Sequence, residues 1–287
     1  MNESLKEMDA EYAPLPGFQE NRPSEWYHAI DYASASLLKA GAKSWKQAKY
    51  RKDHPQDPTP AMVLGTRVHS SILEPHKTAL HPVKPKGMNF STKEGKAWRD
   101  ENPGFITQED NDAIQGMTES VWQNPDAKAL LSLPGRRELS AFALDEDTGL
   151  PLKSRFDFLA NDGILVDVKT TDCARLFEWQ RTCAKYLYHV QAAFYSDVYK
   201  RISGDDPKAF FFVAVERDAP YECCVYQIGD ASIEKGRMEY TRLLWEYRAC
   251  VESGVWPGYF SGTKQFDLPR WALNSEPDQD ELIYSLA

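Results

Sequence analysis

The sequence predicts an α/β protein, because β-rich runs alternate with segments in which apolar residues recur at helical spacing. The clearest signal is a hairpin: runs 152–159 and 164–170 flank Asn161-Asp162-Gly163, and glycine tolerates the positive φ that the turn requires. Three further runs have strand character: 138–144, 209–216 and 222–228. A chain of 287 residues, 42% of them hydrophobic, is long enough for one α/β domain with insertions.

The predicted hairpin brings charged side chains together. Asp157 lies on its first strand, and Asp167 and Lys169 lie two residues apart on its second. Side chains alternate between the faces of a strand, so Asp167 and Lys169 share a face, and pairing across the turn brings Asp157 near them. Two carboxylates and an amine at the edge of a sheet are suited to hold a divalent cation beside a phosphate.

A helix begins near residue 35, with Ser34 or Ser36 as its N-cap. Four lysines follow at spacings of four, three and three: Lys39, Lys43, Lys46 and Lys49. They share roughly one helical face if Gly41 does not break the helix. One interpretation is a solvated basic face. The other is a rail for the DNA backbone, with a helix N-terminus available to a phosphate.

Residues 61–74 form an amphipathic helix that stops before Pro75, with Leu64, Val68 and Ile72 as its apolar stripe. Gly65 and His69 lie four residues apart on an adjacent line. A histidine here is compatible with an ordinary core or surface position. The small residue one turn earlier leaves room beside the imidazole, which favours a site. Glu74, at the end of the helix, is a weaker candidate ligand.

Helices are also predicted at 108–131, 174–203 and 233–250. In the second of them, Gln191 and Tyr195 are polar-tipped and four residues apart, so we expect them to line a site. Tyr188 and Tyr199 share their stripe and fit a core. Residues 24–262 are predicted to form a single domain, between a weakly ordered segment, 1–23, and an acidic tail, 263–287.

Net charge and cysteine content limit the possible classes. The 34 basic and 43 acidic residues give a net charge of −9, which excludes a protein that coats nucleic acid with its whole surface but leaves a locally basic channel possible. Five cysteines without a Cys-x-x-Cys pair favour free thiols in a reducing cytoplasm. No apolar run approaches the roughly 18 residues of a membrane span, and the N-terminus lacks the apolar core of a signal peptide. We therefore expect a cytoplasmic protein.

Five motifs carry a family resemblance. They run in order: Ser34 to Leu38, Gly65 to His69, Arg155 to Asp157, Asp167 to Lys169, and Gln191 to Tyr195. In this order and placement they resemble the PD-(D/E)XK nuclease superfamily in its RecB-like branch, and most closely the exonuclease VIII (RecE-type) family of phage and prophage recombination. The resemblance spans about residues 25–260. Phe156-Asp157 stands where the superfamily often carries Pro-Asp.

The resemblance implies a restriction-endonuclease-like core, with a mixed β-sheet flanked by helices, and a magnesium site in which manganese can substitute. Oxygen-rich ligation with a single imidazole suits these cations. The implied metal ligands are His69, Asp157, Asp167 and the backbone carbonyl of Val168. Lys169 is implied to orient the attacking water and to stabilise charge on the phosphate. Gln191 and Tyr195 are implied to position the DNA or the lysine.

The implied activity is a metal-dependent 5′-to-3′ exodeoxyribonuclease. It digests linear double-stranded DNA and leaves 3′ single-stranded tails for an annealing recombinase in a bacterial or phage-infected cell. We also expect a ring-shaped trimer or tetramer. One alternative is a Cas4-type nuclease, but those often carry an iron–sulfur cluster with one cysteine far upstream, and residues 1–172 contain none. Another is a catalytically silent DNA-binding module, which has no need of the complete His69, Asp157, Asp167 and Lys169 set.

Overall fold

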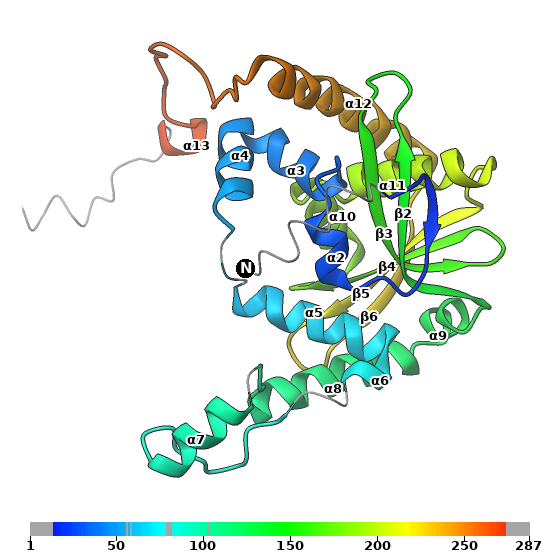
Figure 1. Cartoon of the computed structure of the whole chain (residues 1–287). Coiled ribbons are helices and arrows are strands. Elements are labelled where there is room, and N and C mark those ends of the chain that lie inside the picture. Colours follow the sequence, from blue (N-terminus) through cyan, green and yellow to red (C-terminus); the bar gives the residue numbers. More distant parts are fainter. Residues whose placement is uncertain (1–13, 56, 58, 79–81, 103, 274–287) are drawn as a thin grey trace, which may run out of the picture.

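The computed structural model describes residues 14–55, 57, 59–78, 82–102 and 104–273. Its centre is one six-stranded sheet in which the spatial order of strands follows the sequence (Figure 1). The strands are β1 (Gly17–Gln19), β2 (Gly135–Leu144), β3 (Pro151–Ala160), β4 (Ile164–Thr171), β5 (Ala209–Glu216) and β6 (Cys223–Gln227). β4 and β5 are parallel and the other neighbours are antiparallel. The mixed sheet predicted from the sequence is confirmed.

Twelve helices surround the sheet in the described part of the chain. They are α2 (Ser24–Ala29), α3 (Ala35–Lys43), α4 (Trp45–Asp53), α5 (Pro60–Leu73), α6 (Pro75–Thr78), α7 (Lys93–Glu101), α8 (Gln108–Gln123), α9 (Pro125–Leu131), α10 (Leu176–Lys185), α11 (Tyr188–Ser203), α12 (Asp230–Ser253) and α13 (Arg270–Leu273). α10 and α11 form the crossover that a parallel β4–β5 pair requires. None of the described helices is long and apolar enough to cross a membrane.

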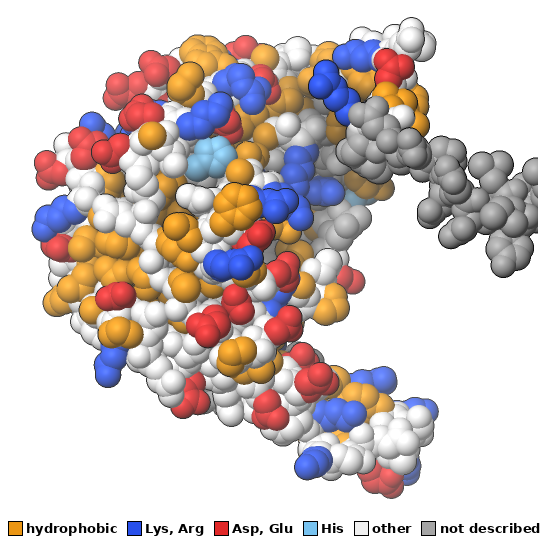
Figure 2. All heavy atoms as spheres, turned by 180° about the vertical axis from the view of Figure 1, so that it is seen from behind, with side chains coloured by type: hydrophobic (Ala, Val, Ile, Leu, Met, Phe, Trp, Pro, Cys, Tyr) orange, Lys and Arg blue, Asp and Glu red, His pale blue; other side chains and the backbone are white. Residues whose placement is uncertain are grey.

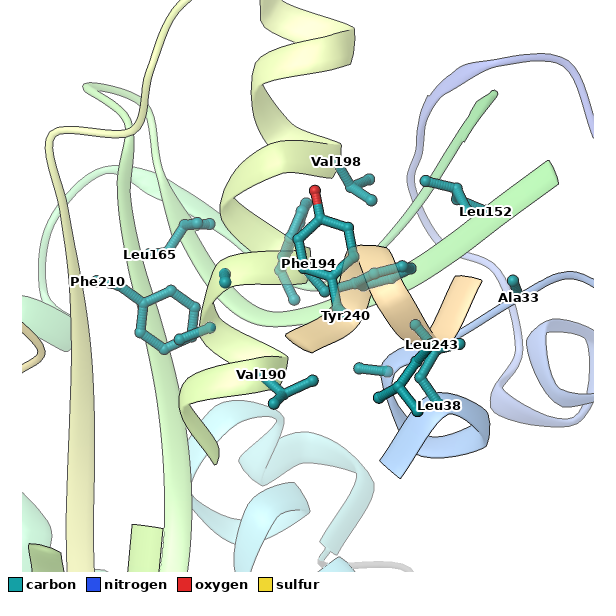
Figure 3. Packing of buried hydrophobic residues seen from close by; sticks show 14 of the residues in the cluster. Ala33, Leu38, Leu152, Leu165, Val190, Phe194, Val198, Phe210, Tyr240 and Leu243 are labelled. Carbon is teal, nitrogen blue, oxygen red and sulfur yellow. The ribbon is translucent and has the colours of Figure 1, made fainter. Parts of the chain in front are cut away.

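One face of the sheet is covered by α3, α11 and α12. Leu38, Phe194 and Leu243 on these helices belong to the same buried cluster as Phe156 and Leu165 on the strands. Figure 3 shows these helices packed together around Phe194 and Tyr240. The apolar residues at helical spacing on α11 therefore form the core of this layer.

The opposite face is covered by α5, α8 and α9. Val68 of α5 and Met117 of α8 are fully buried and belong to a second cluster with Phe158, Val166 and Val213 of the sheet. Neighbouring residues of β4 therefore serve different layers: Leu165 packs in the first cluster and Val166 in the second. This alternation directs Asp167 and Lys169 towards the α11 layer, on the same face as Leu165.

The helix predicted through the four lysines is two helices. Ser44 ends α3 and caps α4, accepting a hydrogen bond on Oγ from Gln47 N at 3.3 Å. Gly41 is not the break. A Cβ there would lie 2.3 Å from the Trp45 ring, so glycine lets the indole pack across α3. Lys39 and Lys43 consequently lie on a different helix from Lys46 and Lys49.

Other boundaries also differ from the predictions. β1 lies within the segment expected to be weakly ordered and pairs with β2, whereas residues 1–13 lie outside the described residues. β2 begins at Gly135, three residues earlier than predicted. Of the predicted acidic tail, residues 263–273 are described and 274–287 are not. The five cysteines are free thiols, as expected, although four of them are only half-buried.

Candidate active site

The site forms where β3 and β4 stop pairing. The ladder joins Phe158 to Val166 and Leu159 to Leu165, and the same register would place Asp157 opposite Asp167. Instead, Asp157 Oδ2 accepts a hydrogen bond from the backbone N–H of Val168 at 2.8 Å. The Val168 N–H thus donates to a side-chain carboxylate instead of a backbone carbonyl of β3, and the two strands separate at this point.

The β2–β3 pair is distorted at the same level. The ladder pairs Arg137 with Phe158 and Leu139 with Phe156, but Glu138 between them has a φ of +49°, which is uncommon for a residue other than glycine. Phe156 packs in the α11 layer, whereas Phe158, two residues later, packs in the α5 layer. Alternation is therefore interrupted beside Asp157. Distortions of this kind cluster at functional sites.

His69 reaches the site from α5. Its Nδ1 lies 3.4 Å from Asp157 Oδ2. Burial and the Lys169 ammonium lower the pKa of His69 to about 4, opposed by the Asp167 carboxylate and by a hydrogen bond with the Val168 backbone. The imidazole is therefore neutral near pH 7, and neutral imidazole is the form that binds metal. Gly65, one turn earlier, faces Thr170 of β4: a Cβ there would lie 3.7 Å from its Oγ1.

Glu138 joins this group, although the sequence analysis did not propose it. Ligand atoms of His69, Glu138 and Asp157 all lie within 4.8 Å of one another, and Glu138 Oε2 forms an ion pair with Arg155 Nε at 2.7 Å. The weaker candidate Glu74, at the C-cap of α5, is not part of the group. The available signal was antiparallel pairing of 138–144 with the first hairpin strand, which places Glu138 opposite Asp157.

Asp167 and Gln191 form the next layer of the site. Asp167 is 1% exposed, and its Oδ1 accepts a hydrogen bond from Gln191 Nε2 at 2.7 Å. Its Oδ2 is in ion-pair contact with the Lys169 ammonium. The structure therefore brings Asp157, Asp167, Lys169 and Gln191 together.

A second lysine enters the site: Lys39, one of the four lysines for which a solvated face and a DNA-backbone rail were the two interpretations. Lys39 Nζ donates to Gln191 Oε1 at 2.9 Å. The ammonium groups of Lys39 and Lys169 lie 5.3 and 5.1 Å from the centre of the Tyr188 ring, where cation–π attraction helps to hold both. Burial and the neighbouring Lys169 lower the pKa of Lys39 to about 8. Burial opposes the charge on Lys169, but Asp167 and Asp157 raise its pKa above the ordinary value.

The remaining predicted residues surround this centre. Tyr195 packs edge-on against Phe156 at 5.4 Å, and burial raises its pKa well above the ordinary value. Ser34 Oγ caps α3 and lies 3.0 Å from Ser36 Oγ. Lys43 and Lys46 are exposed, and Lys49 forms an ion pair with Asp53.

The residues present fit a hard divalent cation. Burial and the Asp167 carboxylate raise the pKa of Asp157 well above its ordinary value, so the pocket concentrates negative charge that a cation would relieve. Asp167 Oδ2 is buried beside the Lys169 ammonium, which offsets part of this negative charge. Two carboxylates close to a neutral imidazole form a donor set that magnesium and manganese accept.

Comparison with one solved structure supports the fold. A "putative exonuclease" from Eubacterium rectale superimposes with a TM-score of 0.60 at 12% identity, covering 90% of this chain and 99% of that one. An alkaline exonuclease from Laribacter hongkongensis gives a TM-score of 0.39 at 19% identity, covering 80% and 95%. A comparison with curated proteins gives no match. A family model matches residues 34–266, so the chain belongs to the PDDEXK-like domains of unknown function (DUF3799) and has the PD-(D/E)XK nuclease fold.

Proposed function

We propose that this protein is a divalent-metal-dependent nuclease that hydrolyses phosphodiester bonds of DNA. The observation that carries the proposal is the convergence of His69, Asp157, Asp167 and Lys169 where β3 separates from β4. A structural domain has no use for buried carboxylates that face one another, because each raises the cost of ionising the other. Residues from both helical layers meet at this opening, as a site that acts on a substrate requires.

His69, Asp157, Asp167 and the carbonyl of Val168 would hold the cation, with Glu138 as an additional carboxylate. Magnesium is the expected ion and manganese its substitute. Bound there, it would supply a Lewis acid beside the scissile phosphate. The backbone of Val168 lies next to two of these ligands, since its N–H donates a hydrogen bond to Asp157 and its backbone also contacts His69.

Lys169 stabilises the negative charge that develops on the phosphate oxygens and orients the attacking water. Its ammonium is held by Asp167 and by the Tyr188 ring, so it is positioned before substrate arrives. Gln191 bridges Asp167 and Lys39 through its two amide atoms. Lys39 thereby adds a second positive charge to the same pocket, and Tyr195 supports Phe156 next to Asp157.

The substrate we propose is the end of linear double-stranded DNA, digested 5′ to 3′ to leave 3′ tails for a single-strand annealing recombinase. The resemblance to the exonuclease VIII family supports this polarity and partner, and it also supports a ring-shaped homo-oligomer of three or four subunits. Ser34 and Ser36 at the start of α3, with Lys43, Lys46 and Lys49 beyond it, would contact the DNA backbone.

Digestion of end-labelled linear duplex tests the proposal, with circular duplex as the control substrate. We expect cleavage of the linear form in Mg²⁺ or Mn²⁺ and little in Ca²⁺, which prefers more oxygen ligands in looser geometry. Five-prime and three-prime labels report the polarity. Robust cleavage in excess EDTA would show that the proposed metal dependence is wrong.

The variant Lys169→Ala separates binding from chemistry. It should bind duplex ends in Mg²⁺ but lose at least about two orders of magnitude in cleavage, the scale of removing one preorganised electrostatic stabiliser. Lys208→Ala is the matched control, because Lys208 is an exposed lysine paired with Asp162. If Lys169 only neutralises Asp167, the folded variant would cleave at near the wild-type rate in saturating Mg²⁺, and that result would reject the mechanism.

A further inference from the structure

α4 and the irregular segment that follows α12 form a surface rich in aromatic and basic side chains. We call it the α4 surface and define it by Lys46, Tyr50, Tyr259, Phe260, Lys264 and Phe266. The aromatic side chains are largely exposed to solvent: Phe266 is 82% exposed, Tyr259 73%, Phe260 60% and Tyr50 58%. Several large aromatic groups exposed together mark an interaction site more often than single exposed apolar residues do.

The segment is fixed to α4 by several contacts. Lys46 N donates to the Pro257 carbonyl at 3.0 Å, and Gln47 Nε2 donates to Tyr259 Oη at 2.9 Å. The Lys49 ammonium lies 5.8 Å from the centre of the Trp256 ring. These contacts hold the start of the segment, residues 256–259, against α4, and Phe260 follows directly.

The charge of this region is opposite to that of the whole chain. Residues 44–54 and 254–273 contain six lysines and arginines and two aspartates, a local net charge of +4 in a chain of −9. Lys264 Nζ lies 4.9 Å from the centre of the Phe260 ring, so a cation and an aromatic face are offered together. Figure 2 shows basic and hydrophobic side chains gathered on this projecting part of the molecule.

We propose that the α4 surface binds single-stranded DNA, with bases stacked on Phe260 and Phe266 and phosphates near Lys46 and Lys264. Stacking on aromatic side chains beside a basic track is the usual way in which proteins hold single strands without sequence preference. Duplex DNA offers phosphates but keeps its base faces stacked, so it would use the lysines alone. A second protein chain is less favoured, because the centres of protein interfaces are depleted in lysine.

The position of the surface connects it to the active site. Lys39, which bonds to Gln191, lies on α3, and α4 begins directly after α3 ends at Ser44. Lys43 is four positions after Lys39, about 6 Å further along α3, and lies next to Ser44, where α4 begins. This inference rests on the proposed function in one respect. When the nuclease digests one strand of a duplex, the complementary strand is left single-stranded, and that is the strand we expect the surface to bind.

Binding in EDTA tests the surface without any cleavage. The probes are fluorescent oligo(dT) of about 12 nucleotides, within the usual site size, and an abasic strand of equal length. Wild type should prefer oligo(dT), and the double variant Phe260→Ala/Phe266→Ala should bind it about tenfold more weakly or worse, with unchanged affinity for the abasic strand. Phe177→Ala is the matched control, since Phe177 is 63% exposed with Arg181 at 5.8 Å.

Each outcome decides between the proposals. Equal binding of oligo(dT) by wild type and the double variant would overturn the inference, as would equal loss on both probes, which would indicate charge alone. If the double variant instead changes the mass in light scattering and keeps its oligo(dT) affinity, the surface is an interface between copies. If wild type prefers oligo(dT), the double variant loses that preference, and no duplex cleavage is found, then the proposed nuclease function is wrong. The proposed single-strand binding site would still be supported.

Discussion

At the scale of single residues, the candidate site depends on two positions where strand geometry is broken. Asp157 gives its carboxylate to the Val168 N–H instead of continuing the β3–β4 ladder. Glu138, opposite it, has a positive φ and an ion pair with Arg155. Both carboxylates are thereby held close to His69. The unfavourable backbone conformation at these positions is tolerated because the surrounding structure holds it in place.

Glu138→Gln tests whether this carboxylate belongs to the metal site. The amide keeps the size and a hydrogen bond to Arg155 but removes the charge, so Mn²⁺ affinity measured by calorimetry should fall about tenfold or more, as with groups that support metal ligands. Glu74→Gln is the control, because Glu74 lies outside the ligand group. Equal Mn²⁺ affinity in both variants would exclude a role for Glu138.

The sequence predicts the residues whose position follows from local rules. Asp167 and Lys169 share a face by strand alternation, and a turn that pairs two strands brings Asp157 beside them. Lys39 and Glu138 were not assigned to the site, because their positions depend on packing between elements. Lys39 enters because α3 lies against α11, and Glu138 enters because the pairing of β2 with β3 places it opposite Asp157.

At the scale of elements, an ion pair and a close approach of two helices join α11 to α12. Arg237 of α12 donates two hydrogen bonds to Asp197 of α11, at 2.7 and 2.8 Å. Gly236 lets the helices approach closely, since a Cβ there would lie 2.2 Å from the His189 carbonyl oxygen. α12 therefore supports the helix that carries Gln191 into the site.

Gly236→Ala should destabilise the fold by about 1–3 kcal/mol, the usual cost of overpacking, because a backbone carbonyl cannot yield as a side chain can. Urea unfolding measures the change. Gly229→Ala, at the N-cap of the same helix, is the matched control: nothing lies within 4 Å of its Cβ. Alanine is a poorer N-cap than glycine, but it also lowers the entropy of the unfolded chain, so we expect a change below about 1 kcal/mol. Equal stability of both variants would show that α11 moves to accommodate the methyl group.

Element boundaries were predicted less well than element types. The hairpin at 152–170 appears as β3 and β4 because its alternation and Asp-Gly turn are local signals. The break at Ser44 was missed, although serine is a strong N-cap, because the lysine spacing continues across it. Helix α7 lies in a stretch for which no element was predicted, where Phe90, Trp98 and Phe105 form a small aromatic cluster of their own.

At the scale of the whole molecule, two projections extend from the sheet. One carries α4 and α13 and the other carries α7, with an open concave space between them (Figures 1 and 2). The α7 projection, residues 82–107, contains five lysines and arginines and three acidic residues, so it too is more basic than the chain as a whole. An overall charge of −9 repels DNA at a distance. DNA binding therefore depends on how these basic parts are arranged in space.

A closed ring of three or four subunits would gather these basic parts around a central channel, since rotational symmetry repeats each surface about one axis. We therefore expect light scattering to give three or four times the chain mass of 32.7 kDa. Because a ring encloses its substrate, digestion begun on labelled duplex should continue after excess unlabelled duplex is added as a trap. A monomer at working concentration that still digests processively through the trap would contradict the ring. A ring whose digestion stops at once would show that the channel does not hold the DNA.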